Sequence, residues 1–374
     1  MLPIMMAFFV MSFCDLVGIG VDRVKSDFNL SNTMAQLIPL AVFLWFAFLS
    51  VPIGILQDRI GKRNVLNLGM IVTAIGLLLP FLIYDFTIIL IGFGLLGIGN
   101  TIVQVSANPL LIDEVPSEKK SSFLSFSQFI KAIGSMIAPP LTGWLAAQYG
   151  DWKLIFLVFG VVSILTVLWL GSTKIEETKN TEARASVVSS LKLLINPYIA
   201  MMVMSIFLIV GIDVGMNSVS GQFLLNKYQV SDAFALSGRS VYFFGKMLGT
   251  FGGALMLTLL PSRKFFFWSA VLAIASILGL LVAPNEMIAL IVLFIIGLGV
   301  SNIFPLVFSL TVERYPNRTN EISGLMIMAV SGGIIPWIIG IVTDVSDNVT
   351  VGMFVFLLCA VYILISALAN LKKS

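Results

Sequence analysis

The stretch Ser172–Ser190, with the sequence STKIEETKNTEARASVVSS, lies at the midpoint of the chain and separates two apolar halves. Its charged residues have both signs, and it contains few large apolar side chains in a sequence that is 58% hydrophobic overall. A segment of this composition buries too little apolar surface to fold by itself. We therefore expect a solvated linker with a folded unit on each side of it.

Short sequence patterns on one side of the linker recur on the other side at a nearly constant separation. Val10–Val21 and Val203–Val214 both begin with VMS, and both contain VGI-x-V. Two further matches are Leu90–Ile91 with Gly97-x-Gly99 against Leu290–Ile291 with Gly297-x-Gly299, and Pro139-x-x-x-Gly143 against Pro336-x-x-x-Gly340. All three matches occur in the same order, about 193 to 200 positions apart. The second half is therefore predicted to repeat the first.

Apolar runs recur along the whole chain, and only 11% of its residues are charged. Each run has roughly 20 residues, which is enough for a helix to cross a bilayer. The runs are continuously apolar rather than alternating, so they do not have the pattern of a membrane β-barrel. The predicted spans are 2–21, 34–56, 64–84, 86–112, 122–147, 153–171, 197–222, 235–260, 265–283, 286–310, 322–342 and 350–370.

These spans predict an all-α membrane protein with twelve transmembrane helices in two pseudo-symmetric six-helix bundles. The predicted boundaries are an N-terminal bundle over 1–171, a cytoplasmic linker over 172–194 and a C-terminal bundle over 195–374. With both termini in the cytoplasm, 15 of the 22 Lys and Arg residues fall in inner loops and the tail, and only 4 fall in outer loops. This asymmetry predicts a multi-pass protein of the plasma membrane, the inner membrane in bacteria, with cytoplasmic N- and C-termini.

The composition argues against several classes of function. The sequence has no histidine, and its two cysteines, Cys14 and Cys359, both lie in apolar spans. Proton relays and metal sites built on histidine are therefore excluded, and a disulfide framework is not expected. The net charge of +3 reflects membrane topology, so nucleic acid is not an expected partner. We predict no enzyme activity, no metal site and no cofactor, and Met1 leads straight into a span without the basic region of a cleavable signal peptide.

Polar residues inside the spans of the first half mark a candidate site, because ionisable groups in a membrane usually face a bundle interior or an aqueous cavity. Asp15 lies in the first span and Lys131 in the fifth. The two form either a gating pair or a permanent structural pair. Three amides at four-residue spacing share one face of the fourth span, where they suit a hydroxylated ligand or, equally, helix–helix hydrogen bonds. The candidate substrate ligands here are Asn100, Gln104, Asn108, Gln128 and Lys131.

The second half offers a similar set. Asp213 lies one turn before Asn217 in the seventh span, and Lys246 lies deep in the eighth. Asp213 and Lys246 again form either a gating pair or a structural one. Aromatic rings in these spans can stack on a sugar ring, although most such rings face lipid or neighbouring helices. The candidates are the ion-coupling residues Asp15, Asp213 and Lys246 and the substrate ligands Asn217, Tyr242, Asn302 and Trp337.

Two further charged residues lie near the outer ends of their spans. Arg239 is close enough to the end of the eighth span to extend its charge to the membrane surface. Asp22, next to Arg23, is expected to lie at the interface rather than in the site.

The loop after the second span reads Gly54-Ile55-Leu56-Gln57-Asp58-Arg59-Ile60-Gly61-Lys62-Arg63. It resembles the signature loop of the major facilitator superfamily, G-x-L-x-D-R-x-G-R-K, and it occupies the position where that loop is found. Gly61 permits a tight turn, and Asp58 is placed for a basic partner or a helix end. The resemblance implies a gating role, as a latch of the inward-closed arrangement, for Gly54, Asp58, Arg59, Gly61 and Arg63.

Within that superfamily, the sequence is similar to the fucose/galactose/glucose–proton symporters. The seventh span resembles their V-G-x-E-V at Val210–Val214, and the tenth resembles F-N-S-I-M-F-P-T-I-F-S-L at Gly299–Leu310. The eleventh resembles S-G-L-x-x-M-A followed by G-G-x-I-x-P. In the first half, E-T-A-A-N-P is similar to Gln104–Pro109, and A-Q-x-F-N-x-x-G is similar to Ser127–Gly134.

The charged positions of that family are changed in this chain. Its helix-4 glutamate corresponds to Gln104, its helix-1 Asn-Asp falls around Gly18, and its helix-5 Asn corresponds to Lys131. Its helix-8 Arg corresponds to Thr250, with Lys246 one turn earlier. The resemblance therefore implies a sugar carrier whose coupling residues are rearranged.

The leading hypothesis is import of a sugar or sugar derivative by alternating access, with a proton or sodium as the coupling ion. The extra positive charge in the spans favours an alternative, a carrier of an acidic sugar such as a uronate or sialic acid, or of another organic anion. An uncoupled sugar facilitator is a further alternative, and a non-transporting sensor or a drug exporter is less favoured. We expect a monomer in a lipid bilayer.

Overall fold

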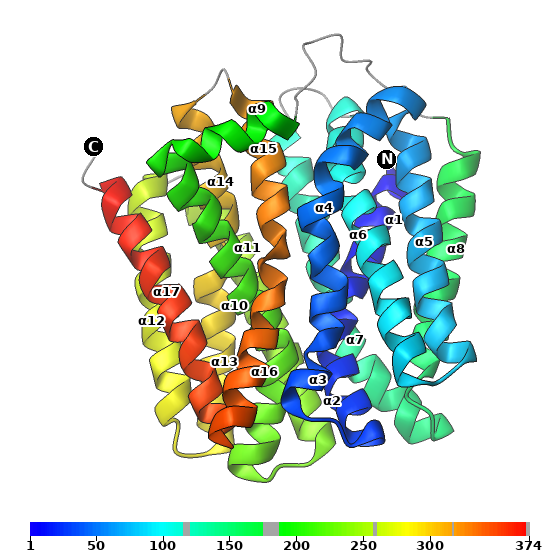
Figure 1. The fold of residues 1–374 in the computed structure, drawn as a ribbon, viewed down its shortest axis with the longest axis vertical. Helices are drawn as coiled ribbons and strands as arrows, with labels where there is room; N and C mark the ends of the chain where they lie inside the picture. Colours follow the sequence, from blue (N-terminus) through cyan, green and yellow to red (C-terminus); the bar gives the residue numbers. More distant parts are fainter. Residues whose placement is uncertain (115–119, 175–186, 257–259, 316–317, 372–374) are drawn as a thin grey trace. The chain divides into compact units, whose positions relative to one another are not determined.

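The computed structural model describes residues 1–114, 120–174, 187–256, 260–315 and 318–371. Every regular element in these ranges is a helix (Figure 1). The chain divides into two compact units. The first contains Met1–Val17 and the chain from Ala41 to the linker, and the second contains Gly18–Leu40 and the chain after the linker. The predicted all-α membrane fold is confirmed.

The first unit is built from long helices and a short 3-10 segment. The elements are α1 (Leu2–Met11), η1 (Ser12–Leu16), α4 (Leu37–Ile60), α5 (Lys62–Leu82), α6 (Phe86–Glu114), α7 (Lys120–Tyr149) and α8 (Leu154–Ser172).

The second unit begins with the end of the first span and continues after the linker. Its elements are α2 (Val17–Phe28), α3 (Asn32–Ala35), α9 (Val187–Lys192), η3 (Leu193–Ile195), α10 (Pro197–Tyr228), α11 (Asp232–Met256), α12 (Ser262–Val282), α13 (Glu286–Val300), α14 (Ile303–Arg314), α15 (Thr319–Met328), η5 (Ala329–Ile334), α16 (Ile335–Ser346) and α17 (Val349–Leu371).

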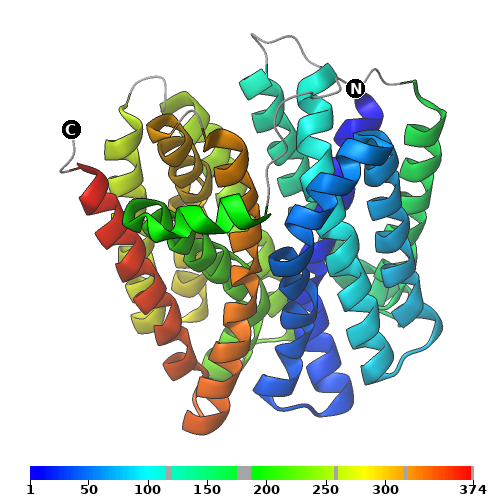
Figure 2. The same ribbon diagram turned by 45° about the horizontal axis from the view of Figure 1, so that its top comes forward.

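The linker predicted over 172–194 is partly helical. Within the second unit, α9 and η3 run crosswise to the long helices, and α9 packs against α15 (Figure 2). The intervening residues 175–186 lie outside the described part of the chain. The predicted boundaries of the two bundles stay a prediction, since the structural division assigns Gly18–Leu40 to the second unit.

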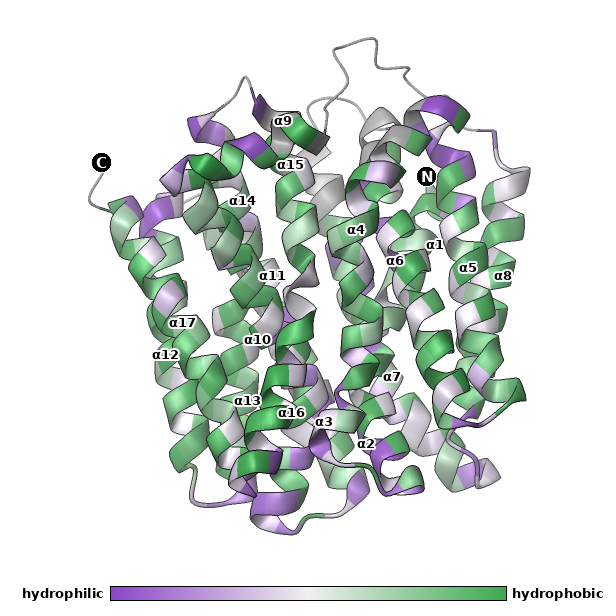
Figure 3. Ribbon diagram, in the orientation of Figure 1, coloured by the Kyte–Doolittle hydropathy of each residue, from purple (hydrophilic) through white to green (hydrophobic). Residues whose placement is uncertain are grey.

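Ten helices in the described ranges are long and apolar enough to cross a membrane. Hydrophobic residues run along the helices, and hydrophilic ones gather at their ends (Figure 3). Two further predicted spans correspond to α7 and α11, which have 30 and 25 residues. These two are less apolar because they contain charged residues, among them Lys131 in α7 and Lys246 in α11.

Within the described residues, three predicted spans are interrupted well inside their length. The first changes from α-helix to 3-10 helix at η1, the tenth is broken between Val300 and Ile303, and the eleventh contains η5. Pro305 follows the break in the tenth span and cannot donate a backbone hydrogen bond to the preceding turn. In membrane carriers, interrupted helices often form substrate and ion sites because they expose backbone groups and helix ends.

The sequence repeat corresponds to a structural repeat that is found in each unit separately. In the first unit, a Cβ on Gly97 would overlap the carbonyl oxygen of Val42, so α6 and α4 touch through this glycine. In the second unit, a Cβ on Gly297 would overlap the carbonyl oxygen of Tyr242, so α13 and α11 touch in the same way. Gly97 and Gly297 are 200 positions apart in the sequence, and so are Val42 and Tyr242.

The second glycines of the G-x-G motifs, Gly99 and Gly299, also make equivalent helix contacts in the two units. A Cβ on Gly99 would lie 2.6 Å from the backbone nitrogen of Thr73 in α5, and one on Gly299 would lie 3.1 Å from that of Ala273 in α12. Thr73 and Ala273 are again 200 positions apart. The paired glycines therefore set the same close packing of three helices in each unit.

Gly97→Ala and Gly297→Ala are each expected to destabilise the protein by about 1–3 kcal/mol, because the added methyl group has no space beside a backbone carbonyl. The apparent melting temperature of detergent-purified protein, followed by a thiol-reactive dye, checks this through the buried thiols of Cys14 and Cys359. Gly252→Ala is the matched control, because nothing lies within 4 Å of its Cβ position. Equal melting temperatures for all three variants would contradict the prediction.

Candidate functional site

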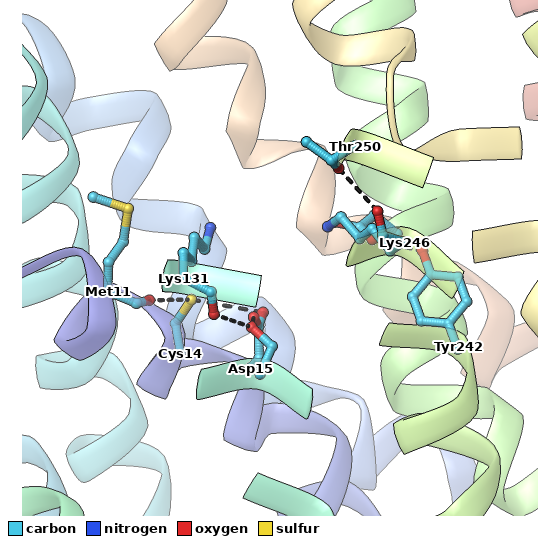
Figure 4. A network of polar contacts seen from close by, with 9 residues as sticks. Met11, Cys14, Asp15, Lys131, Tyr242, Lys246 and Thr250 are labelled. Carbon is cyan, nitrogen blue, oxygen red and sulfur yellow. Dashed lines mark hydrogen bonds and ion pairs between the residues drawn. The ribbon is translucent and has the colours of Figure 1, made fainter. Parts of the chain in front are cut away.

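The first unit places Asp15 within the 3-10 segment η1 of the first span. Ser135 of α7 donates a hydrogen bond from its hydroxyl to Oδ2 of Asp15 at 2.5 Å. The thiol of Cys14 lies 3.8 Å from Oδ1 (Figure 4). Helix α7 comes this close because Gly134 has no side chain, and a Cβ there would overlap the hydroxyl of Ser12.

Lys131 lies one turn before Ser135 on α7, but its side chain points away from Asp15 (Figure 4). Its backbone carbonyl accepts a hydrogen bond from Ser135 at 3.2 Å. Among the residues that the structure describes, Asp15 and Lys131 do not form an ion pair. The permanent structural pair considered from the sequence is therefore not present in this conformation.

The amide row of the fourth span is confirmed as a row on α6, and its members bond mainly to one another. The Asn100 amide donates to the carbonyl oxygen of Met11 at 2.7 Å, where the first span changes to 3-10 helix. Gln104 donates to Oδ1 of Asn100 at 2.9 Å, and Asn108 donates to the carbonyl of Gln104 at 3.3 Å. Asn100 is 1% exposed, so it joins α6 to the first span, while Gln104 and Asn108 are half-buried.

The second unit contains a compact cluster of three predicted residues, of which Tyr242 and Lys246 are labelled in Figure 4. Asp213 on α10 accepts a hydrogen bond from the hydroxyl of Tyr242 at 2.6 Å and from the ammonium of Lys246, also at 2.6 Å. Tyr242 and Lys246 are one turn apart on α11 and bind different oxygens of the carboxylate. The side chains of Asp213 and Lys246 are 29% and 27% exposed, so the pair is only partly shielded.

We expected the ring of Tyr242 to stack on the substrate, but in this conformation the ring is buried inside the protein. Its side chain has 0% exposure, and its hydroxyl is engaged by Asp213. The ring therefore has no face open to a ligand here, and its contact with Asp213 orients the carboxylate.

The other candidate ligands of the second unit are spread over several elements. Asn302 lies at the break of the tenth span, is 5% exposed and donates to the carbonyl of Gly249 at 2.7 Å, so it joins that break to α11. Asn217 is 2% exposed and packs against Gly18. Trp337 on α16 is half-buried, and its indole nitrogen has no hydrogen bond within the described ranges. In the first unit, Gln128 on α7 is exposed.

The loop with the predicted gating residues forms a tight turn between α4 and α5. Gly61 has φ +92°, a conformation that favours glycine. Arg63 donates from Nε to the carbonyl of Leu170 at 3.1 Å and from Nη2 to that of Gly171, so it caps the end of α8. A Cβ on Gly54 would have nothing within 4 Å, and Arg59 is exposed. The side chain of Asp58 lies outside the described part of the structure.

One charged pair was not predicted from the sequence. Arg239 was expected to reach the membrane surface, but it has 0% exposure and its Nη2 lies 2.5 Å from Oδ2 of Asp22. The expected surface positions of Arg239 and Asp22 were both wrong. The two residues are 217 positions apart in the sequence and form an ion pair inside the protein. Gly221 lies beside the pair, where a Cβ would overlap both side chains, so the close approach depends on this glycine.

Repeated helical units, interrupted spans and a polar cluster with a carboxylate in each unit define a membrane carrier of the transporter type. The sequence profile of the Major Facilitator Superfamily matches residues 4–338. The chain therefore belongs to this superfamily of transporters, and it is not an enzyme.

The relatives and a solved structure agree with this assignment. The glucose/galactose transporter of Brucella abortus biovar 1 is 26% identical, over 98% of this chain and 92% of its own length. The putative glucose/galactose transporter of Helicobacter pylori is 27% identical, over 98% of this chain and 95% of its own. The Escherichia coli fucose:proton symporter shares the fold with a TM-score of 0.72 at 20% identity, over 98% and 97% of the two chains. The predicted resemblance to this group of carriers is confirmed.

Asp213→Asn and Lys246→Gln are expected to be coupled in a double-mutant cycle by about 1–2 kcal/mol, because each removes the charged partner of the other. The melting temperatures of the two single variants and the double variant measure this coupling. Thr250→Val is the matched control on the same helix, since among the described residues its hydroxyl bonds to the Lys246 carbonyl alone, at 2.9 Å. Additive effects of the two substitutions would contradict the pairing.

Proposed function

We propose that this protein imports a sugar or sugar derivative across the plasma membrane by alternating access, driven by a coupled cation, with the proton as the first candidate. The observation that carries the substrate class is the similarity, over nearly the whole chain, to two proteins named as glucose/galactose transporters. The likeness to a fucose:proton symporter in fold is consistent with it. Under this proposal the protein is a monomer in a lipid bilayer, with both termini in the cytoplasm.

The two carboxylates in the polar clusters support the coupling part of the proposal. Asp213 is bound to a lysine and a tyrosine of α11, and Asp15 is bound to a serine of α7. A carboxylate that exchanges a protein partner for a proton can link ion binding to a change in helix packing. Lys246 then serves as the partner that Asp213 releases and recovers during the cycle.

The substrate ligands under this proposal are the polar residues that remain accessible. Gln104, Asn108 and Gln128 are half-buried or exposed and carry amide groups that suit sugar hydroxyls. Asn100 is 1% exposed, so it supports Gln104 within the first unit. Asn217 and Asn302 are 5% exposed or less, so each has a packing role within the second unit.

An acidic substrate is the second candidate. The observation that favours it is the side chain of Lys131, whose ammonium has no hydrogen bond or ion pair within the described residues. An unpaired cation in a membrane-spanning helix is costly, and an anionic ligand would offset that cost.

We expect purified protein in proteoliposomes to exchange radiolabelled glucose or galactose in a counterflow assay. An inward proton gradient should increase uptake in the absence of a sugar gradient, and a sodium gradient tests the other coupling ion. Asp213→Asn should preserve counterflow but reduce gradient-driven uptake at least about tenfold, which corresponds to roughly 1.4 kcal/mol of lost coupling. The absence of counterflow with both neutral and acidic sugars would contradict the proposal.

Lys131→Met separates the two substrate classes. If the substrate is acidic, glucuronate counterflow should fall by about tenfold or more, since removing one close charge partner costs at least about 1.4 kcal/mol. If the substrate is neutral, galactose counterflow should remain within about threefold of that of the unaltered protein, a difference below about 1 kcal/mol. Lys192→Met, in the exposed segment before α10, is the control for a general effect of charge. Glucuronate exchange that is insensitive to Lys131→Met would remove the case for an acidic substrate.

A further inference from the structure

A buried ion pair outside the clusters described above joins the end of the first span to α11. Arg239 has 0% exposure, and the side chain of Asp22 is 11% exposed. The Arg239 Nη2 lies 2.5 Å from Asp22 Oδ2, and the Arg239 Nε donates to the carbonyl of Asn217 at 2.6 Å. A buried pair of this kind is stable only while both charges are present, because a lone buried charge is strongly unfavourable. Neutralising Asp22 would therefore leave Arg239 buried without its partner and weaken the contact between α2 and α11.

Several buried polar atoms of the pair and of the neighbouring helix α10 are incompletely satisfied. Oδ1 of Asp22, Oγ of Ser220, Nε2 of Gln222 and Nη1 of Arg239 have no hydrogen-bond partner within the described chain. Buried polar atoms nearly always have a partner, and ordered water is the usual one when the protein supplies none. Oδ1 of Asp22 is thus an acceptor position in a polar environment, where a proton can bind while Arg239 stays on Oδ2.

Asp22 differs in this respect from the other two carboxylates in the spans. The two oxygens of Asp213 are each bound, to Tyr242 and to Lys246. Asp15 accepts a short hydrogen bond from Ser135. Asp22 combines a buried cationic partner on one oxygen with a second oxygen that has no hydrogen-bond partner among the described residues.

The surrounding packing lets the pair act on the position of a helix. Gly18 lies one turn before Asp22 on the same face of α2, and a Cβ there would overlap Asn217 of α10. Gly221 gives the same close approach on α10, directly beside the pair. Helix α2 follows the 3-10 segment η1, and a 3-10 segment within a longer helix often marks a functional hinge.

We propose that Asp22 is a proton-coupling residue of the transport cycle, which binds a proton on its carboxylate and thereby releases α2 from Arg239. This inference rests on the proposed proton-coupled transport. A proton from the aqueous side adds to Oδ1 and forms an O–H bond, so the carboxylate becomes neutral while Arg239 keeps its charge. Loss of the proton restores the pair and draws α2 back to α11.

The other charged groups near Asp22 affect the same equilibrium. Lys25 lies one turn further along α2 and faces both Asp22 and Asp344 of α16. Arg23 forms an ion pair with Asp232 of α11 at 3.0 Å, and the Asp232 side chain is 66% exposed. Helix α10 contributes Gln222, whose amide group lies beside Asp22. The amide oxygen of Gln222 accepts a hydrogen bond from Lys25 at 3.2 Å. Arg239 is thus the buried partner, and the remaining pairs are closer to water.

The test uses proteoliposomes that contain a pH-sensitive dye, with galactose as the probe. The unaltered protein should carry out galactose counterflow and should take up protons together with galactose. An inward gradient of one pH unit can support at most about tenfold accumulation with one proton per sugar. Asp22→Asn should retain counterflow, lose galactose-dependent proton uptake and lose the pH dependence of accumulation.

Two further variants keep the result interpretable. Asp22→Asn leaves Arg239 buried without its partner, so the double variant Asp22→Asn/Arg239→Gln, with two neutral amides, guards against misfolding. Asp232→Asn is the matched control, because it removes the exposed carboxylate of the adjacent pair and should leave proton uptake unchanged. Retention of galactose-dependent proton uptake in the double variant would overturn the inference, and so would loss of counterflow in both folded Asp22 variants, which indicates a purely structural pair. If the unaltered protein exchanges no sugar, the proposed function fails and this inference fails with it.

Discussion

The free-energy cost of a charged side chain inside a membrane-spanning helix constrains this structure more than any other interaction. An ionisable group at that depth needs a partner of opposite charge, several hydrogen bonds or access to water. Three different arrangements stabilise the charged groups in the spans of this protein. Asp213 is held by a lysine and a tyrosine of one neighbouring helix, and Asp15 is held by a serine hydroxyl. Arg239, which is completely buried, is held by Asp22.

These three arrangements differ in how readily they can change. The Asp213 cluster is about one quarter exposed, so solvent screening makes its ion pair weaker and easier to exchange. The Asp22–Arg239 pair is shielded, so its loss affects helix packing strongly. A carrier benefits from both types, because one can respond to a ligand and the other can hold a helix in place until its charge state changes.

Glycine supplies the second constraint, since it decides where helices can touch through their backbones. Gly97 and Gly297 bring corresponding helices into contact in the two units, and the contacts are 200 residues apart. Gly18 and Gly221 do the same around the buried ion pair. The small residues therefore set the framework, and the charges are placed at the points where the framework brings helices together.

The sequence by itself determined the class of this protein. Hydrophobic length, the Lys and Arg distribution and the repeated motifs depend on local composition and on chain order, so they predicted the membrane helices and the internal repeat. The sequence also identified Asp213 and Lys246 as possible partners, because both lie deep in apolar spans. It could not assign a partner to Lys131. This lysine also lies within an apolar span, as Lys246 does, but its side chain points away from Asp15. It likewise placed Asp22 and Arg239 at the surface, because position along a span does not reveal which neighbouring helix covers a side chain. Only the tertiary structure decided those pairings, since burial and ion pairing between residues 217 positions apart depend on how helices pack.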